Sequence, residues 1–204
     1  MKKLFAVVLT VLMLLALGAC GAKEEAPVTG GWSAAESIEL SEEAREAFEK
    51  AMEGLTGVDY EPLALIGTQL VSGTNYAILC EARAVAPDAQ PYYAVVFVYR
   101  DLQGGAKLLK IAALDLGAIA ESGKVEAAGA VPEQLVGGWT VDRESSVELE
   151  GALLHLASQV VAGTNHCLLC EGGELVFVYE NLEGETEVTS RAVIDPGVLL
   201  EAAD

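Results

Sequence analysis

Two short stretches decide how this chain folds: Gln159-Val160-Val161-Ala162-Gly163-Thr164-Asn165 and an earlier counterpart, Gln69-Leu70-Val71-Ser72-Gly73-Thr74-Asn75. Each is followed by an apolar segment that ends in Cys-Glu, at Cys80-Glu81 and at Cys170-Glu171. A glycine followed by Thr-Asn between two strand-like runs predicts a bend between antiparallel strands. Because the pattern occurs twice, the chain is expected to contain two copies of one unit.

Three further landmarks recur in the same order around these bends. They are Gly30-Gly31-Trp32-Ser33 with Gly137-Gly138-Trp139-Thr140, Val96-Phe97-Val98-Tyr99 with Val176-Phe177-Val178-Tyr179, and Leu102-Gln103-Gly104 with Leu182-Glu183-Gly184. An ordered set of matched landmarks indicates an internal repeat rather than a chance similarity.

The two copies differ between the tryptophan and the glutamine. This interval is 37 positions from Trp32 to Gln69, but 20 positions from Trp139 to Gln159. The segment missing from the second copy is residues 41–55, which begins with a serine suited to cap a helix and two glutamates suited to its first turn. Apolar residues then recur at helical spacing, and a glycine follows at position 57. We predict an amphipathic helix here and none in the second copy.

The remaining apolar segments predict four strands in each copy. They are residues 60–71, 74–85, 92–102 and 107–116 in the first copy, and residues 147–161, 164–171, 175–181 and 186–194 in the second. The expected fold class is α+β: one helix packed on a four-stranded antiparallel sheet, followed by a second antiparallel sheet without a helix. Both faces of the strand around Tyr92–Tyr99 are apolar, and one helix covers only one face. We therefore expect the second sheet to pack on the first or to extend it.

The N-terminal residues predict export. Lys2 and Lys3 precede an apolar run at residues 4–17 that is short for a membrane span, so residues 1–19 are expected to be a removed signal peptide. Leu17-Gly18-Ala19-Cys20 resembles the lipobox of bacterial lipoproteins. That resemblance implies a lipid on Cys20, which would anchor the chain to the bacterial cell membrane, facing outside the cytoplasm. The alternative is an ordinary secretory signal followed by a cysteine by chance.

The net charge of the chain excludes two classes of partner. Loss of Lys2 and Lys3 takes the formal charge from −19 to −21, and such a surface repels nucleic acid and anionic lipid head groups. Neither is an expected partner, and the membrane contact is expected from the lipid alone.

Residues 20–29 have the composition of a tether. We expect the first copy at residues 30–117, a linker at 118–136 with one helical turn at 132–136, and the second copy at 137–204.

A helix, a strand, a Gln-x-Val-x-Gly hairpin and a meander together resemble the cystatin superfamily of cysteine-protease inhibitors, and the first copy is most similar to the stefin type. The first bend fits the motif with Gln69, Val71 and Gly73, and the second fits it with Gln159, Val161 and Gly163. Gly30 and Gly31 correspond to the N-terminal glycines of the family. The similarity covers about residues 30–117, and about 137–197 without the helix.

The resemblance implies a mechanism. In this family the glycine-led N-terminal segment and two hairpins form a wedge that fills the active-site cleft of a papain-like cysteine protease. The six motif residues would form the first-hairpin contacts, and Gly30 and Gly31 the N-terminal trunk. A glycine in the first hairpin permits a close backbone approach that a Cβ would prevent. The second hairpin would use Leu102 and Gly104, and Leu182 and Gly184; both hairpins keep the glycine but lack the other family residues.

The second copy departs from the family pattern in two ways: it lacks the helix, and its Gly137-Gly138 follows a linker rather than a free N-terminus. The second copy therefore has the hairpin sequence that matches the family motif more closely, but it lacks the helix and the free N-terminal glycines. If the chain inhibits proteases, we expect the first bend to be the better candidate.

Other candidate chemistry is weaker. Cys167 and Cys170 have the spacing of a redox or metal pair, but residues three apart in a strand point to opposite faces, so we interpret them as small buried side chains. Cys80 and Cys170 occupy equivalent positions and could pair if the two sheets meet there. His155 and His166 have no nucleophile at a recognisable spacing. Trp32 and Trp139 are either anchors of the core or exposed contacts to a partner.

We therefore expect a surface-tethered lipoprotein that inhibits papain-like cysteine proteases, with no catalytic site, metal or cofactor of its own. The alternative is a non-inhibitory interaction or ligand-binding module of the bacterial cell envelope on the same fold, because a fold does not fix a function.

Overall fold

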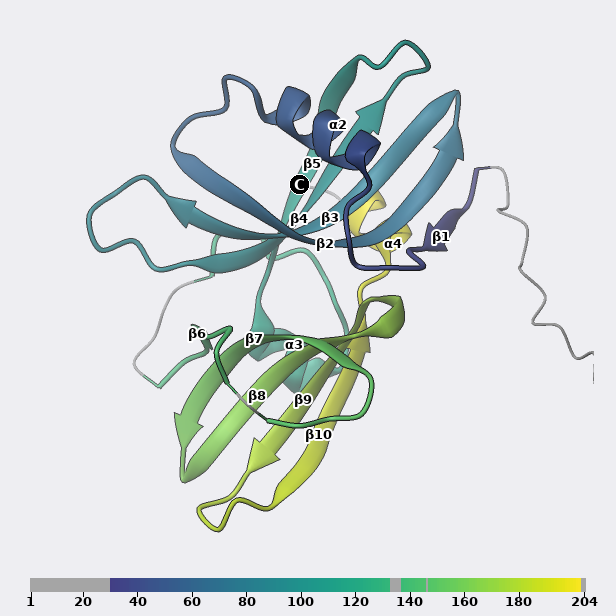
Figure 1. Cartoon of the computed structure of the whole chain (residues 1–204). Coiled ribbons are helices and arrows are strands. Elements are labelled where there is room, and N and C mark those ends of the chain that lie inside the picture. The colour runs from purple at the N-terminus through teal and green to yellow at the C-terminus, as the bar shows by residue number, and fades with distance from the viewer. Residues whose placement is uncertain (1–29, 133–136, 146, 203–204) are drawn as a thin grey trace, which may run out of the picture.

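The computed structural model describes residues 30–132, 137–145 and 147–202. Two five-stranded antiparallel sheets, one from each copy, form its framework (Figure 1). The lipobox cysteine and the signal peptide lie outside the described residues, as does most of the expected helical turn at 132–136. No helix in the described part of the chain is long and apolar enough to cross a membrane.

Sheet A consists of adjacent antiparallel strands in chain order: β1 (Trp32–Ala34), β2 (Val58–Val71), β3 (Gly73–Ala84), β4 (Tyr92–Arg100) and β5 (Ala106–Leu114). The expected number of four strands is wrong by one. The residues after the Gly-Gly pair form an edge strand, in which Trp32 lies opposite Gln69 of β2.

The predicted helix is confirmed as α2 (Glu42–Met52), which packs on one face of sheet A (Figure 1). The side chain of Ser41 accepts a hydrogen bond of 3.2 Å from the backbone N–H of Ala44, which caps the helix. Ala44, Ala47 and Phe48 form its buried stripe. They pack against side chains of β3 and β4: Tyr76, Ile78, Cys80, Val96 and Val98.

Sheet B repeats the arrangement with β6 (Thr140–Val141), β7 (Ala152–Val161), β8 (Gly163–Cys170), β9 (Glu174–Glu180) and β10 (Thr186–Val193). A short 3₁₀ turn, η2 (Glu171–Gly173), joins β8 to β9. The predicted strand at 147–161 begins only at residue 152. The residues before it instead cross the outer face of sheet B, where Val147 and Leu149 pack on Leu168 and Val176 (Figure 1). This segment occupies the place that α2 has on sheet A.

The other faces of the two sheets share one core, as expected from the two apolar faces of β4. Phe97 and Tyr93 of sheet A and Phe177 and Leu156 of sheet B are buried in it. The Tyr93 hydroxyl donates a hydrogen bond of 2.6 Å to the main-chain oxygen of Leu156, so the contact between the sheets includes a buried polar link.

Each copy ends in a short helix that packs against the sheet of the other copy. The first, α3 (Leu116–Ser122), follows sheet A and contacts β10, whereas α4 (Pro196–Glu201) follows sheet B and contacts β5. Gly117 approaches the Trp139 ring, and Gly197 approaches the Trp32 ring. The expected linker at 118–136 thus begins inside a helix, and Ile119 is buried in the shared core.

Candidate functional site

The predicted first bend and the N-terminal glycines come together at one end of sheet A. The backbone N–H of Gly30 donates to the oxygen of Leu70 at 3.1 Å, and the Gln69 amide donates to the oxygen of Gly30 at 2.8 Å. Asn75 of β3 donates to the Gln69 side-chain oxygen at 2.7 Å. We call Gly30, Gln69 and Asn75 the first triplet. It fixes the N-terminal segment beside the hairpin.

Gly73 sets how closely the first hairpin approaches the second. Its φ is +127°, and a Cβ there would lie 2.3 Å from the main-chain oxygen of Arg100. The Tyr99 hydroxyl donates a hydrogen bond of 2.6 Å to the oxygen of Ser72 across the same contact. A glycine is required here because both the backbone conformation and the close approach exclude a side chain.

The second hairpin, at residues 101–105, lies at the same end of sheet A. The carboxylate of Asp101 accepts hydrogen bonds from the backbone N–H groups of Gln103 and Gly105, at 2.8 and 2.9 Å, which fixes the turn. Gly104 has a φ of +84°. Leu102 at the tip is 77% exposed, and Leu70 and Val71 on the first hairpin are 48% and 38% exposed. The two tips thus present aliphatic side chains to solvent.

The second copy repeats the side-chain bonds of this geometry. Gln159 donates to the oxygen of Gly137 at 2.9 Å, and Asn165 donates to Gln159 at 2.9 Å; these residues form the second triplet. Gly163 has a φ of +123°, and a Cβ there would lie 2.4 Å from the oxygen of Glu180. The Gly137 oxygen is therefore bonded as the Gly30 oxygen is, although Gly137 follows the expected linker.

The exposed residues at this second end are Val160, Val161 and Leu182, at 75%, 46% and 83%. The hairpins that carry them lie at the opposite end of the molecule from those of sheet A (Figure 1). The predicted site residues thus form two groups. Gly31 and Gly138 precede their tryptophans, and Gly184 with a φ of +84° repeats the turn of Gly104.

The motif residues divide by role. The Gln69 and Gln159 amides are engaged inside the protein, and Gly73 and Gly163 permit the close approach of the hairpins. These four residues position the tips. The side chains left for a partner are the exposed aliphatic residues of the hairpins.

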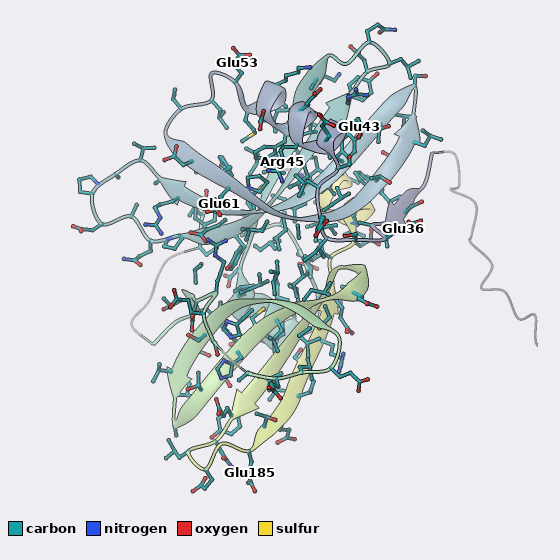
Figure 2. All side chains as sticks on the ribbon, viewed as in Figure 1. Glu36, Glu43, Arg45, Glu53, Glu61 and Glu185 are labelled. Carbon is teal, nitrogen blue, oxygen red and sulfur yellow. The ribbon has the colours of Figure 1, made fainter. Side chains whose placement is uncertain are left out.

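Charge distinguishes the two ends. Beside the first, Lys50 donates to the oxygen of Gly104 at 3.1 Å, and the Lys107 ammonium lies 5.2 Å from the centre of the Tyr99 ring. At the second end, Glu180 occupies the position that Arg100 has in sheet A, opposite the threonine after the bend. The chain as a whole is strongly acidic, with a formal charge of −19; Figure 2 labels Glu36, Glu53 and Glu185 among the carboxylates on its outside.

The sequence did not predict that His155 and His166 would meet. They lie on β7 and β8 on the outer face of sheet B, 9% and 4% exposed, with His155 Nε2 3.0 Å from His166 Nδ1. The other ring nitrogens contact the main-chain oxygen of Asp142 and, at 3.1 Å, the Glu180 carboxylate. Burial lowers the pKa of His155, which favours the neutral form of that ring. The signal available in the sequence was the placement of both histidines on paired strands.

The cysteines and tryptophans resolve the alternatives left open by the sequence. Cys167 faces the shared core and Cys170 the outer face of sheet B, as alternation in a strand predicts. Cys80 lies under α2, so it does not meet Cys170, and all three described cysteines are free.

Trp32 and Trp139 pack edge-on against Phe97 and Phe177, with ring centres 5.7 and 5.5 Å apart, and thus anchor the core. The described residues contain no group of three or more His, Cys, Asp or Glu side chains that could hold a metal ion.

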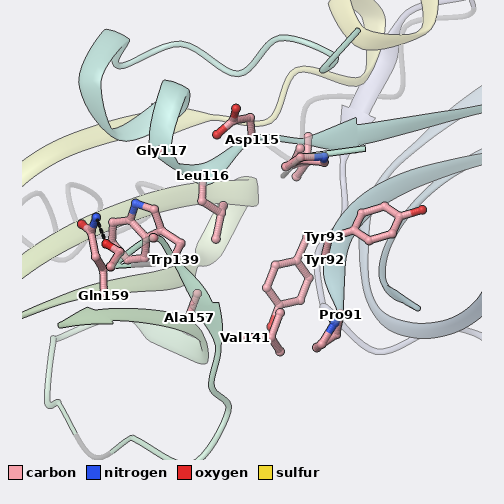
Figure 3. A pocket seen from close by; sticks show the side chains of 14 residues that line it. Pro91, Tyr92, Tyr93, Asp115, Leu116, Gly117, Trp139, Val141, Ala157 and Gln159 are labelled. Atoms are coloured by element: carbon pink, nitrogen blue, oxygen red, sulfur yellow. Dashed lines mark hydrogen bonds between the residues drawn. The ribbon is translucent and has the colours of Figure 1, made fainter. Parts of the chain in front are cut away.

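A cavity of about 320 Å³ lies where the second triplet meets the contact between the sheets (Figure 3). Tyr93 and Pro91 of the first copy face Trp139 and Val141 of the second across it, and Gln159 lies at its edge (Figure 3). Asp115, also on the wall, is occupied as the cap of α3, because it accepts a hydrogen bond of 3.1 Å from the N–H of Ala118. The lining is therefore mainly aromatic and aliphatic, and the Gln159 amide at the rim is already bonded to Gly137 and Asn165.

No family model, no curated protein and no solved structure matches the chain.

Proposed function

We propose that the protein is a surface-tethered, binding-type inhibitor of papain-like cysteine proteases. A single observation carries the proposal: a glycine-led segment, a Gln-x-Val-x-Gly hairpin and a second hairpin gather at one end of each sheet. The exposed aliphatic tips suit insertion into an apolar cleft, since burial of such side chains drives association.

The first end is the stronger candidate. Its trunk glycine precedes the edge strand β1 and can meet a partner without an intervening copy, and α2 supports its sheet. The second end has the same glutamine and asparagine side-chain bonds and more exposed aliphatic residues, so it is proposed as a second binding edge. Cys20 is proposed to carry the lipid that attaches the protein to the outside of a bacterial cell membrane.

The test is inhibition of papain by residues 20–204 carrying Cys20→Ser, measured with active-site-titrated enzyme. Val71→Asp and Leu102→Asp are expected to weaken inhibition about tenfold or more, because a charge placed in an apolar contact costs at least ~1.4 kcal/mol. Val161→Asp and Leu182→Asp test the second end in the same way.

Val85→Asp is the matched control, because Val85 is 66% exposed but follows β3 at the other end of sheet A. It should leave inhibition unchanged. Absence of inhibition by the parent chain, or equal losses in Val71→Asp and Val85→Asp, would overturn the proposal.

The cavity favours a second candidate function, the binding of a small, largely apolar ligand. A pocket of about 320 Å³ with aromatic walls has the size and lining of a small-molecule site. Titration with the neutral probe N-phenyl-1-naphthylamine tests it. The probe should quench Trp139 in a Trp32→Phe chain and leave Trp32 unchanged in a Trp139→Phe chain; equal responses would exclude this cavity.

A further inference from the structure

Four groups on the outer face of sheet B form a continuous row: the main-chain oxygen of Asp142, the imidazoles of His155 and His166, and the carboxylate of Glu180. We call it the histidine row. Asp142 is the first residue of the segment that covers this face, residues 142–145 and 147–149, which we call the cover segment. The row therefore joins the cover segment to β7, β8 and β9.

The protons in this row can be counted. A carbonyl oxygen and a carboxylate only accept hydrogen bonds, so the two ends of the row supply no proton. Each of the three contacts needs one proton, whereas two neutral imidazoles carry only two N–H groups between them. The complete row thus holds one proton more than two neutral histidines and an ionised glutamate.

We propose that the histidine row is a single-proton site that holds the cover segment on sheet B while the proton is bound and releases it when the proton is lost. Without that proton, two lone pairs face each other between His155 Nε2 and His166 Nδ1, whose separation is 3.0 Å. His166 Nδ1 can then accept from the Ser145 hydroxyl, which lies 3.3 Å away. His155 Nε2 is left buried without a donor, which disfavours the closed arrangement.

The charged surroundings are consistent with a bound proton. Asp142 on the cover segment raises the proton affinity of His155 by charge, and the Glu180 carboxylate from β9 contacts His166 directly. Glu148 of the cover segment and Glu180 line the same adjoining hollow, together with Ser145 and, from β10, Thr186. Arg143, the cation nearest in the chain, turns to sheet A, where it pairs with Glu61 and Glu81 at 3.4 Å each. The charged side chains beside the row, those of Asp142, Glu148 and Glu180, are thus acidic.

Comparison of the two copies indicates that the site is specific to the second. The positions of His155, His166 and Glu180 are occupied in the first copy by Leu65, Tyr76 and Arg100. There α2 covers the sheet through an apolar contact. The titratable pair occurs only where the helix is replaced by the cover segment.

Release of the cover segment would also affect the second triplet. Thr140 and Val141 of β6, which pair with Ser158 and Ala157 of β7, directly precede Asp142. A freed cover segment would loosen β6 and so the position of Gly137 beside Gln159. The consequence for protease binding depends on the proposed function, but the proton site itself does not.

The experiment is an NMR titration of the histidine ring signals in the full mature chain, combined with amide exchange of residues 147–149. The chain has two histidines, so two single-histidine variants assign both signals. The pair is expected to bind one proton in total between pH 5 and 8, the range in which histidine charge ordinarily changes. Opening releases the proton only while the closed row still holds it. Between the pKa of the histidines in the opened state and the midpoint of the closed row, the opening constant of the cover segment should therefore rise with pH by up to about tenfold per unit, and it should level off above that midpoint.

Glu180→Gln is the decisive variant. Its amide can donate to His166 Nε2, so two neutral imidazoles complete the row. Opening of the cover segment should then be independent of pH between 6 and 8. Glu183→Gln removes one charge from the same hairpin outside the row and should keep the wild-type dependence. Independent titration of both histidines, with equal pH dependence of opening in wild type and Glu180→Gln, would overturn the proposal and leave the protease result untouched.

Discussion

The hydroxyl of Tyr93 in sheet A donates a hydrogen bond of 2.6 Å to the main-chain oxygen of Leu156 in sheet B. Tyr93 is 1% exposed, so this bond lies inside the core that the two copies share. The equivalent contact from the other copy brings Gly173 against Ile66. The two copies therefore meet through related positions, but with a large side chain on one side and a glycine on the other.

Tyr93→Phe removes this bond and keeps the ring. We expect the free energy of unfolding to fall by about 1 kcal/mol, since the Leu156 oxygen keeps a second donor, the N–H of Asp142 at 2.9 Å. Urea unfolding monitored by circular dichroism measures the change. A single transition is expected because the sheets share one core, and two separate transitions would contradict that packing.

Gly73→Ala tests the close approach at the first bend. A Cβ would lie 2.3 Å from the Arg100 oxygen at a φ of +127°, so we expect a loss of at least about 3 kcal/mol in the free energy of unfolding. Gly104→Ala is the matched control, since its φ is +84° but its nearest other heavy atom would be 3.8 Å away. This control should lose about 1 kcal/mol. Equal losses would show that the contact with β4 is not what requires glycine.

The buried thiols predict a loss of stability at alkaline pH. Burial raises the pKa of Cys80 and of Cys167, so the folded chain keeps protons that the unfolded chain releases. Stability therefore falls as pH rises above about 8.5, the ordinary thiol pKa, by up to about 1.4 kcal/mol per pH unit for each thiol. Urea unfolding under reducing conditions between pH 8 and 10 should show a shallower slope in Cys80→Ala. Parallel slopes would contradict the assignment.

Cys20→Ser tests the proposed anchor in a bacterial host. The parent protein should be recovered with membranes and partition into detergent, because a diacyl anchor holds a protein firmly. The variant should appear in the soluble fraction outside the cytoplasm. Membrane recovery of the variant would show that another segment makes the attachment.

Hairpins and the long helix were predictable because their signals are local. Glycine-containing turns, alternating strands and the apolar spacing of residues 41–55 each specify an element without reference to distant residues. The edge strands β1 and β6 were missed because they have three and two residues, too few to show a period. Helices α3 and α4 are short and are stabilised by contacts with the other copy.

The candidate site was predictable in its composition but not in its internal bonding. The motif indicated which residues gather, whereas the structure shows that Gln69 and Gln159 bond to the glycine segments. The histidine pair escaped prediction because register shifts on both sides of His155 change the simple alternation of β7. Which face a residue adopts beyond a bulge depends on the partner strand.

We propose that the two hairpin ends are the edges that bind a papain-like protease, and hydrogen exchange of residues 20–204, measured with and without saturating papain, is the decisive experiment. Exchange should slow at residues 30–31, 70–73 and 101–105, with weaker protection at 160–163 and 181–184, and should stay unchanged in the turn at 85–91. Absence of protection at the hairpins, or protection confined to the turn at 85–91, would exclude the hairpin ends as the binding edges.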